Sequence, residues 1–150
     1  MEFRNQVLIV EDEASIRRLV QATLGAHGYE VAEAAGGEEG LALIEHRDFD
    51  LLVLDLHLPG ISGWDVLERL KSKTREHMRV MILTARSAED EILRGWRAGV
   101  DHYCMKPFDP HEFLEAVQFV VTATHGELVR QREEELSKTQ LLHLVDNVFE

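Results

Sequence analysis

The sequence has 150 residues, of which 28 are acidic and 16 basic, giving a formal net charge of −12 at pH 7. This length predicts one domain, and 45% hydrophobic with 29% charged residues is typical of a globular chain rather than a disordered one. The acidic excess argues against direct nucleic-acid binding, which needs a basic surface. The single cysteine, Cys104, excludes an internal disulfide framework and a multi-cysteine zinc site.

The first residues carry neither a signal peptide nor a membrane span. Only four consecutive apolar residues, Val7 to Val10, stand before Glu11, whereas a bilayer span needs about 20. We therefore expect a cytoplasmic protein that does not contact the membrane.

Short apolar runs alternate along the chain with segments of helical periodicity. Strands are predicted over residues 7–10, 29–32, 50–55, 80–84 and 101–105. Helices are predicted over residues 16–24, 37–45, 64–70 and 88–98, with a last helix from Pro110 onward. Five strands alternating with five helices predict an α/β fold, a doubly wound parallel sheet with helices on both faces.

Reactive side chains follow four of the predicted strands. Glu11 and Asp12 follow the first strand, Asp55 ends the third, Thr84 ends the fourth and Lys106 follows the fifth. Each residue alone is commonly structural; an acidic pair before a helix, for example, often acts as a cap. Ligands of such sheets bind beyond the carboxyl ends of the strands, so the joint placement of these residues predicts a functional site.

The chemistry of this group favours phosphoryl transfer. Three carboxylates held close together repel one another and need a cation. Oxygen-only ligands favour Mg²⁺ or Mn²⁺ over zinc. Such an ion would leave Asp55, at the end of the central strand, as a nucleophile toward phosphorus. Lys106 would supply a positive charge for the phosphoryl group, and the Thr84 hydroxyl could donate to one of its oxygens.

Residues 6–124 resemble the receiver domain of bacterial response regulators, the phosphorylated partners in two-component signal transduction. All five functional positions of that family carry family-typical residue types, with separations of 43, 29 and 22 residues between Asp12, Asp55, Thr84 and Lys106. The matching segments are residues 7–13, 52–63, 82–85 and 98–108.

The resemblance implies a flavodoxin-like fold with strand order 2-1-3-4-5 and phosphorylation of Asp55 in the presence of Mg²⁺. The donor would be a histidine kinase, a phosphotransfer protein or a small phosphodonor. By the same resemblance, Asp12 and Asp55 ligate the metal directly, and Glu11 acts mostly through a water ligand. The backbone carbonyl oxygen of His57 would be the remaining protein ligand of the metal.

Further roles are implied for residues around the acceptor. Lys106 would contact the phosphoryl group, Thr84 would swing toward it, and Tyr103 would move inward behind Thr84. His57 and Arg86 occupy the positions at which the family tunes the lifetime of the phosphorylated state. The added charge and acceptor oxygens would bias a bistable loop and the surface behind it.

We expect the receiver domain to span residues 1–124 and residues 125–150 to form a helical extension. The last helix is expected to continue past the domain, with Gly126 as a weak point. Apolar residues from Leu141 to Phe149 form a broad face that needs a partner. This end either folds back on the domain, self-associates, or leads to an output domain.

The sequence thus predicts a signalling switch rather than an enzyme, with catalysis limited to its own phosphorylation and dephosphorylation. The output surface would be formed by the helix over 88–98, the strand over 101–105 and the helix from Pro110. A homodimer could form through that surface or through the C-terminal helix. Two alternatives remain: a docking module without phosphorylation, and an aspartyl-phosphate phosphatase. The phosphatase class expects a second carboxylate two residues after Asp55, where this chain has His57.

Overall fold

The computed structural model describes residues 5–85 and 89–148. In these ranges the chain forms five strands and seven helices. The strands are β1 (Gln6–Val10), β2 (Glu30–Ala34), β3 (Leu51–Leu54), β4 (Arg79–Thr84) and β5 (His102–Met105). The helices are α1 (Ala14–Gly25), α2 (Gly37–His46), α3 (Gly63–Arg69), α4 (Ser72–His77), α5 (Glu89–Arg97), α6 (Pro110–Thr122) and α7 (His125–Val148).

The five strands form one parallel sheet in the order β2-β1-β3-β4-β5, which confirms the predicted topology. The order reverses between β1 and β3, the two central neighbours at which ligands of such sheets bind. In the register, Val10 of β1 lies opposite Leu54 of β3, and Thr84 of β4 lies opposite Met105 of β5. The residues that follow these positions therefore leave the sheet at the same edge.

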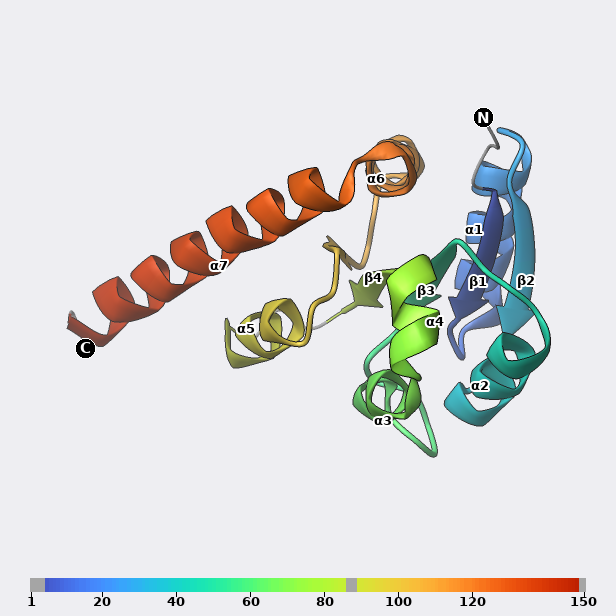
Figure 1. Cartoon of the computed structure of the whole chain (residues 1–150), viewed down its shortest axis with the longest axis horizontal. Coiled ribbons are helices and arrows are strands. Elements are labelled where there is room, and N and C mark those ends of the chain that lie inside the picture. The colour runs from blue at the N-terminus through green and yellow to red at the C-terminus, as the bar shows by residue number, and fades with distance from the viewer. Residues whose placement is uncertain (1–4, 86–88, 149–150) are drawn as a thin grey trace.

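Helices cover both faces of the sheet (Figure 1). On one face, alternate strand residues such as Leu52 and Ile82 pack with α2, α3 and α5. On the other face, Val53 and Leu83 pack with α1 and α6 through residues such as Phe113. The central strands are buried on both sides, which explains why they are continuous apolar runs rather than alternating ones.

The region between β3 and β4 differs from the prediction, because two helices stand where one was expected. Ser62 begins α3 with a capping box to Asp65, and Leu70, in an extended conformation, ends it. The following α4 buries none of its residues. A helix without an inward apolar face leaves no periodicity in the sequence, and this is why it was missed.

The expectation that the last helix continues without interruption past residue 124 is wrong, because two separate helices stand there. The helix α6 ends at Thr122, and α7 begins at His125 after a break at Ala123, whose ψ of 148° is extended. Thr124 caps α7: the Glu127 amide donates to Thr124 Oγ1 (3.1 Å), and the Thr124 amide donates to Glu127 Oε1 (3.4 Å). This reciprocal pair is a capping box, so the helical path is interrupted at Ala123 and Thr124 and not at Gly126.

The helix α7 has two unlike halves. Its first half packs against α5, with Leu128 buried and Leu136 in contact with the core on that face. Its last turns project beyond the body of the molecule (Figure 1), where Leu141, Leu144 and Val148 are exposed. Across the described ranges, no helix combines the length and the apolar character needed to cross a bilayer.

We predict that Gly63→Ala lowers the free energy of unfolding by about 1–3 kcal/mol, because the start of α3 presses directly on the chain after β3. A Cβ atom at Gly63 would lie 2.5 Å from the Asp55 carbonyl oxygen and 2.7 Å from Leu56 Cα, both backbone atoms. Gly25→Ala is the control, since a Cβ there meets nothing within 4 Å. Urea unfolding measures both changes, and equal effects of the two substitutions would contradict this packing.

Candidate functional site

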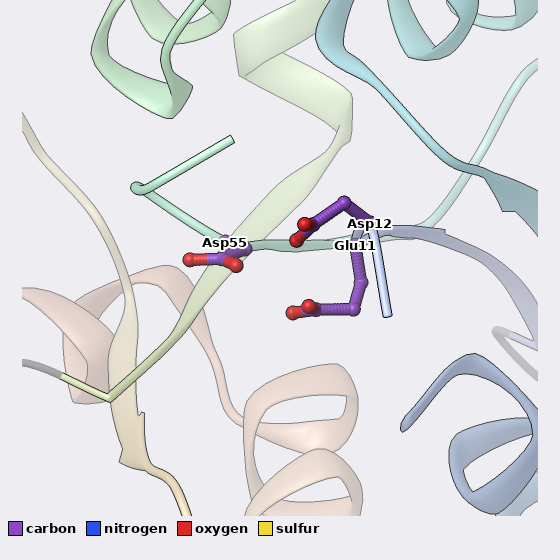
Figure 2. A group of neighbouring side chains, drawn as sticks. All are labelled: Glu11, Asp12 and Asp55. Carbon is purple, nitrogen blue, oxygen red and sulfur yellow. The ribbon is translucent and has the colours of Figure 1, made fainter. Parts of the chain in front are cut away.

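Three carboxyl groups meet at the carboxyl edge of the sheet. Glu11 and Asp12 follow β1, and Asp55 follows β3. Figure 2 shows the side chains of Glu11 and Asp12 extending from adjacent positions toward Asp55, and one carboxylate oxygen from each residue lies within 4.8 Å of the others. Glu11 and Asp55 are buried, whereas Asp12 is exposed. The cluster therefore opens to solvent on the Asp12 side.

The turn that carries the first two carboxylates is held by an arginine of α1. The guanidinium of Arg17 donates to the carbonyl oxygens of Glu11 (2.7 Å) and Asp12 (3.1 Å) and lies 3.3 Å from a carboxylate oxygen of Glu33. The Glu11 amide donates to the Ala34 carbonyl oxygen of β2 (3.1 Å). The backbone of the turn is thus fixed from both sides, while the carboxylate of Asp12 stays exposed.

Both carboxylate oxygens of Asp55 have partners. Oδ1 accepts a hydrogen bond from the His57 amide (2.9 Å), and Oδ2 accepts one from Lys106 Nζ (3.1 Å). The Asp55 amide donates to the Val10 carbonyl oxygen, which continues the β1–β3 ladder by one bond (3.0 Å). The carboxylate therefore has a fixed orientation at the end of the central strand.

Lys106 brings its positive charge into this cluster from the end of β5. Its amide donates to the Thr84 carbonyl oxygen (2.8 Å), and the peptide bond to Pro107 is cis. Its Nζ atom lies 2.7 Å from Glu11 Oε2, an ion-pair distance, although the angle is poor for a hydrogen bond. The ammonium thus lies between the two buried carboxylates and is itself mostly buried.

Burial and mutual repulsion control the protonation of the cluster. Desolvation, followed by the charge of Asp55, raises the pKa of Glu11 above its ordinary value, even though Lys106 acts to lower it. Burial disfavours the charge of Lys106, but the nearby carboxylates of Glu11 and Asp55 outweigh that effect and raise the pKa of the ammonium. The Lys106 side chain is therefore positively charged. Its single charge does not fully offset the effect of burial and of Asp55 on Glu11.

The donor set fits a divalent cation such as Mg²⁺. All three side chains offer carboxylate oxygens, the ligands that Mg²⁺ prefers. When ionised, three carboxylates facing one ammonium leave two uncompensated negative charges, which a divalent ion would balance. The exposed carboxylate of Asp12 gives such an ion a path from solvent.

Thr84 and Tyr103, predicted to move on phosphorylation, are not members of the acidic cluster. Thr84 is fully buried at the end of β4. Tyr103 is half-buried in β5, and its hydroxyl donates to the Glu91 carbonyl oxygen of α5 (2.9 Å). Its ring contacts Trp96 edge-on, with 5.3 Å between ring centroids. A Cβ at Gly95 would lie 1.7 Å from the Tyr103 hydroxyl oxygen, so only glycine admits this arrangement.

Of the two residues predicted to tune the lifetime of a phosphorylated state, only His57 lies within the described ranges. His57 lies two residues after Asp55, and its Nε2 lies 3.3 Å from Glu91 Oε2. Arg86 lies outside the described residues. Sequence reasoning missed Glu91 and Gly95, two residues of α5 that contact His57 and Tyr103. The one signal available was a glycine inside a helical pattern, which often marks close packing.

Known proteins match this chain in both sequence and structure. The family model of the response regulator receiver domain matches residues 7–118. The phosphate regulon transcriptional regulatory protein PhoB of Pseudomonas aeruginosa is 38% identical over 119 residues, which are 79% of this chain and 52% of that protein. The transcriptional regulatory protein SrrA of Staphylococcus aureus is 35% identical over 86% of this chain and 53% of its own length. The chain thus spans about half the length of these curated relatives.

Solved structures agree with the sequence matches. The chemotaxis protein CheY4 of Vibrio cholerae superposes with a TM-score of 0.73 at 30% identity, covering 79% of this chain and 99% of that one. The response regulator protein TrrA of Thermotoga maritima, solved in complex with Mg(2+)-BeF, gives a TM-score of 0.68 at 35% identity, with 77% and 98% coverage.

We predict that Lys106→Met lowers the free energy of unfolding by about 3 kcal/mol in metal-free buffer at neutral pH, because two buried carboxylates lose their counter-charge. Adding Glu11→Gln should restore part of the loss by removing one of those charges. The control is Lys138→Met, since Lys138 forms only an exposed pair with Glu135 and should contribute less than about 1 kcal/mol. If denaturant melts give the two single variants equal stability, the buried cluster does not depend on Lys106.

Proposed function

The chain belongs to the response regulator receiver domain family, and we propose that it acts as a phosphorylation-dependent switch whose acceptor is Asp55. Receiver domains are signalling modules of two-component systems rather than enzymes in their own right. The observation that carries the proposal is the position of Asp55, buried at the point where the strand order reverses, with two more carboxylates within 4.8 Å and Lys106 Nζ at 3.1 Å.

The proposed step is a transfer of one phosphoryl group to a carboxylate oxygen. An oxygen of Asp55 attacks phosphorus while the bond from phosphorus to the donor breaks, and the donor group leaves with the electron pair. The leaving group is acetate from acetyl phosphate, or the imidazole of a histidine kinase or phosphotransfer protein. The two hydrogen bonds to the Asp55 carboxylate fix its direction and so reduce the entropic cost of reaching the attack geometry.

We assign the metal to Asp12, Asp55 and the backbone carbonyl of His57, with Glu11 acting through a water ligand. Mg²⁺ bound there would neutralise the charge of the phosphoryl oxygens. Once a phosphoryl group is present, Lys106 exchanges its contact with Glu11 for a phosphoryl oxygen, and the Thr84 hydroxyl donates to another. Both contacts form only in the phosphorylated state, and this difference is what drives the switch.

The proposed readout passes through Tyr103 into α5. A shift of Thr84 toward the phosphoryl group would draw the Tyr103 ring inward and break its hydrogen bond to the Glu91 carbonyl oxygen. His57 contacts Glu91 from the acceptor loop, so it is proposed, together with Arg86, to tune the lifetime of the phosphorylated state. The output surface then comprises α5, β5 and α6.

The domain limits and partners are part of the same proposal. Residues 1–124 form the receiver domain, and 125–150 form a helical extension that can lead to an output domain. The partner is a histidine kinase or phosphotransfer protein in the cytoplasm. Homodimers would form through the α5–β5–α6 surface or through the exposed apolar residues of α7, which include Leu141 and Leu144.

The proposal is tested by intact mass spectrometry after incubation with acetyl phosphate, with and without Mg²⁺. We expect one phosphoryl group on the wild type only when Mg²⁺ is present, and none on Asp55→Asn. Asp48→Asn, at an exposed position before β3, is the matched control and should be labelled normally. Full labelling of Asp55→Asn would refute the assigned acceptor. An unlabelled wild type would favour the docking module, and steady turnover of a small phosphoester would favour the phosphatase.

We also predict that Mg²⁺ alone stabilises the fold, because it binds the native cluster and not the unfolded chain. At 100 times the dissociation constant the gain is about 2.7 kcal/mol, visible as a rise in Tm. Asp12→Asn removes one ligand from the exposed side and should abolish most of this rise. A rise of the same size in Asp12→Asn would mean that the metal binds elsewhere.

A further inference from the structure

The first half of α7 covers the surface formed by the end of α5 and the start of β5. Leu128, in the first turn, is only 2% exposed, and Leu136 packs against the core that contains Trp96 and Tyr103. Figure 1 shows α7 leaving α6 and running alongside α5 before it projects from the body. Part of the proposed output surface is therefore already occupied by the chain's own helix.

One arginine carries the polar part of this contact. Arg132 Nε donates to the Val100 carbonyl oxygen (3.1 Å), and Nη2 donates to the Gly99 carbonyl oxygen (3.2 Å) and to Asp101 Oδ1 (3.0 Å). The other carboxylate oxygen of Asp101 accepts a hydrogen bond from the Val80 amide of β4 (2.9 Å). The Arg132 guanidinium thus bonds α7 to the turn between α5 and β5. Asp101 of that turn is in turn bonded to β4.

Among the described side chains, the apolar part of this contact depends mainly on Leu128 and Leu136. The large apolar residues described farther along α7 are exposed: Leu141, Leu142, Leu144, Val145 and Val148. At 3.6 residues per turn, Leu141, Leu144 and Val148 lie on the opposite side of the helix from Leu128 and Arg132, and all three are exposed. The described contact therefore lies in the first half of α7, where Leu128 and Leu136 supply its apolar part and the Arg132 hydrogen bonds its polar part.

The acceptors of Arg132 lie where the proposed movement would reach them. Gly99 and Val100 directly follow α5, and that helix is held against β5 by the Tyr103 ring over Gly95 and by the hydrogen bond to the Glu91 carbonyl oxygen. When Tyr103 leaves that position, α5 loses a support and the carbonyl groups at its end shift. Three hydrogen bonds from one rigid guanidinium tolerate little shift, because each needs its own direction.

We propose that the first half of α7 is an intramolecular cover over the α5–β5 surface, held closed by Arg132 and released when Asp55 is phosphorylated. The release step rests on the proposed function, whereas the closed cover is a contact between described residues that exists without phosphorylation.

The test is hydrogen exchange of the α7 amides over residues 128–139 in the full chain. Arg132→Gln should speed their exchange about tenfold or more, as expected for the loss of charge-assisted hydrogen bonds. Arg130→Gln is the matched control, because Arg130 is exposed on the same helix; it should leave the exchange unchanged. If the α7 amides exchange at the same rate in the two variants, Arg132 does not hold the cover closed and the proposal is refuted.

The release is measured on the wild type with acetyl phosphate and Mg²⁺, with the phosphorylated fraction read from the intact mass. Phosphorylated protein should exchange in α7 as Arg132→Gln does, and Asp55→Asn should stay protected. Phosphorylation without faster exchange would overturn the release and leave the proposed function standing. Absence of phosphorylation would refute the proposed function and with it the release, and the closed cover would then be judged by the Arg132→Gln comparison alone.

Discussion

The ammonium of Lys106, buried between the carboxylates of Glu11 and Asp55, is the interaction on which the rest of the site depends. Removing three charged groups from water is costly, and the cost is offset only because the ammonium lies 2.7 Å from one carboxylate and 3.1 Å from the other. These groups follow β1, β3 and β5, so the charge cluster also fixes how three strands end. The carboxylate of Asp55 is thus held in place by an ion pair, a kind of contact for which other ions compete.

The strand β5 connects the charge cluster to α5, which lies farther from Asp55. β5 carries Lys106 into the cluster and Tyr103 under α5, only three residues apart. The backbone carbonyl oxygen of Glu91 in α5 accepts a hydrogen bond from the Tyr103 hydroxyl, and the carboxylate of Glu91 contacts His57. Two routes of contact therefore lead from the surroundings of Asp55 to α5, one through His57 and one through β5 and Tyr103. Because α7 docks on α5 and on the turn that follows it, the C-terminal helix lies at the end of both routes.

The apolar runs of the sequence were enough to predict the five strands, and the resemblance to receiver domains supplied their order. The proximity of Glu11, Asp12 and Asp55 was predictable because the carboxyl ends of parallel strands lie at the same edge of a sheet. The sequence was not enough for contacts between polar side chains and distant carbonyl groups. Arg17 and Arg132 look like solvated residues of amphipathic helices, and only the fold shows which carbonyl oxygens they reach. The break before α7 did have a signal, because Thr124 and Glu127 have capping-box spacing. In the sequence, Gly126 stood out instead as the weak point.

The most direct test of this account is a crystal structure of the chain with Mg²⁺ and beryllium trifluoride, a mimic of a phosphoryl group. The account predicts the metal among Glu11, Asp12 and Asp55, the beryllium on an oxygen of Asp55, and Lys106 Nζ moved from Glu11 to a fluoride. Tyr103 should have lost its bond to the Glu91 carbonyl oxygen. A metal bound away from these carboxylates, or Lys106 still paired with Glu11 beside an occupied Asp55, would contradict it.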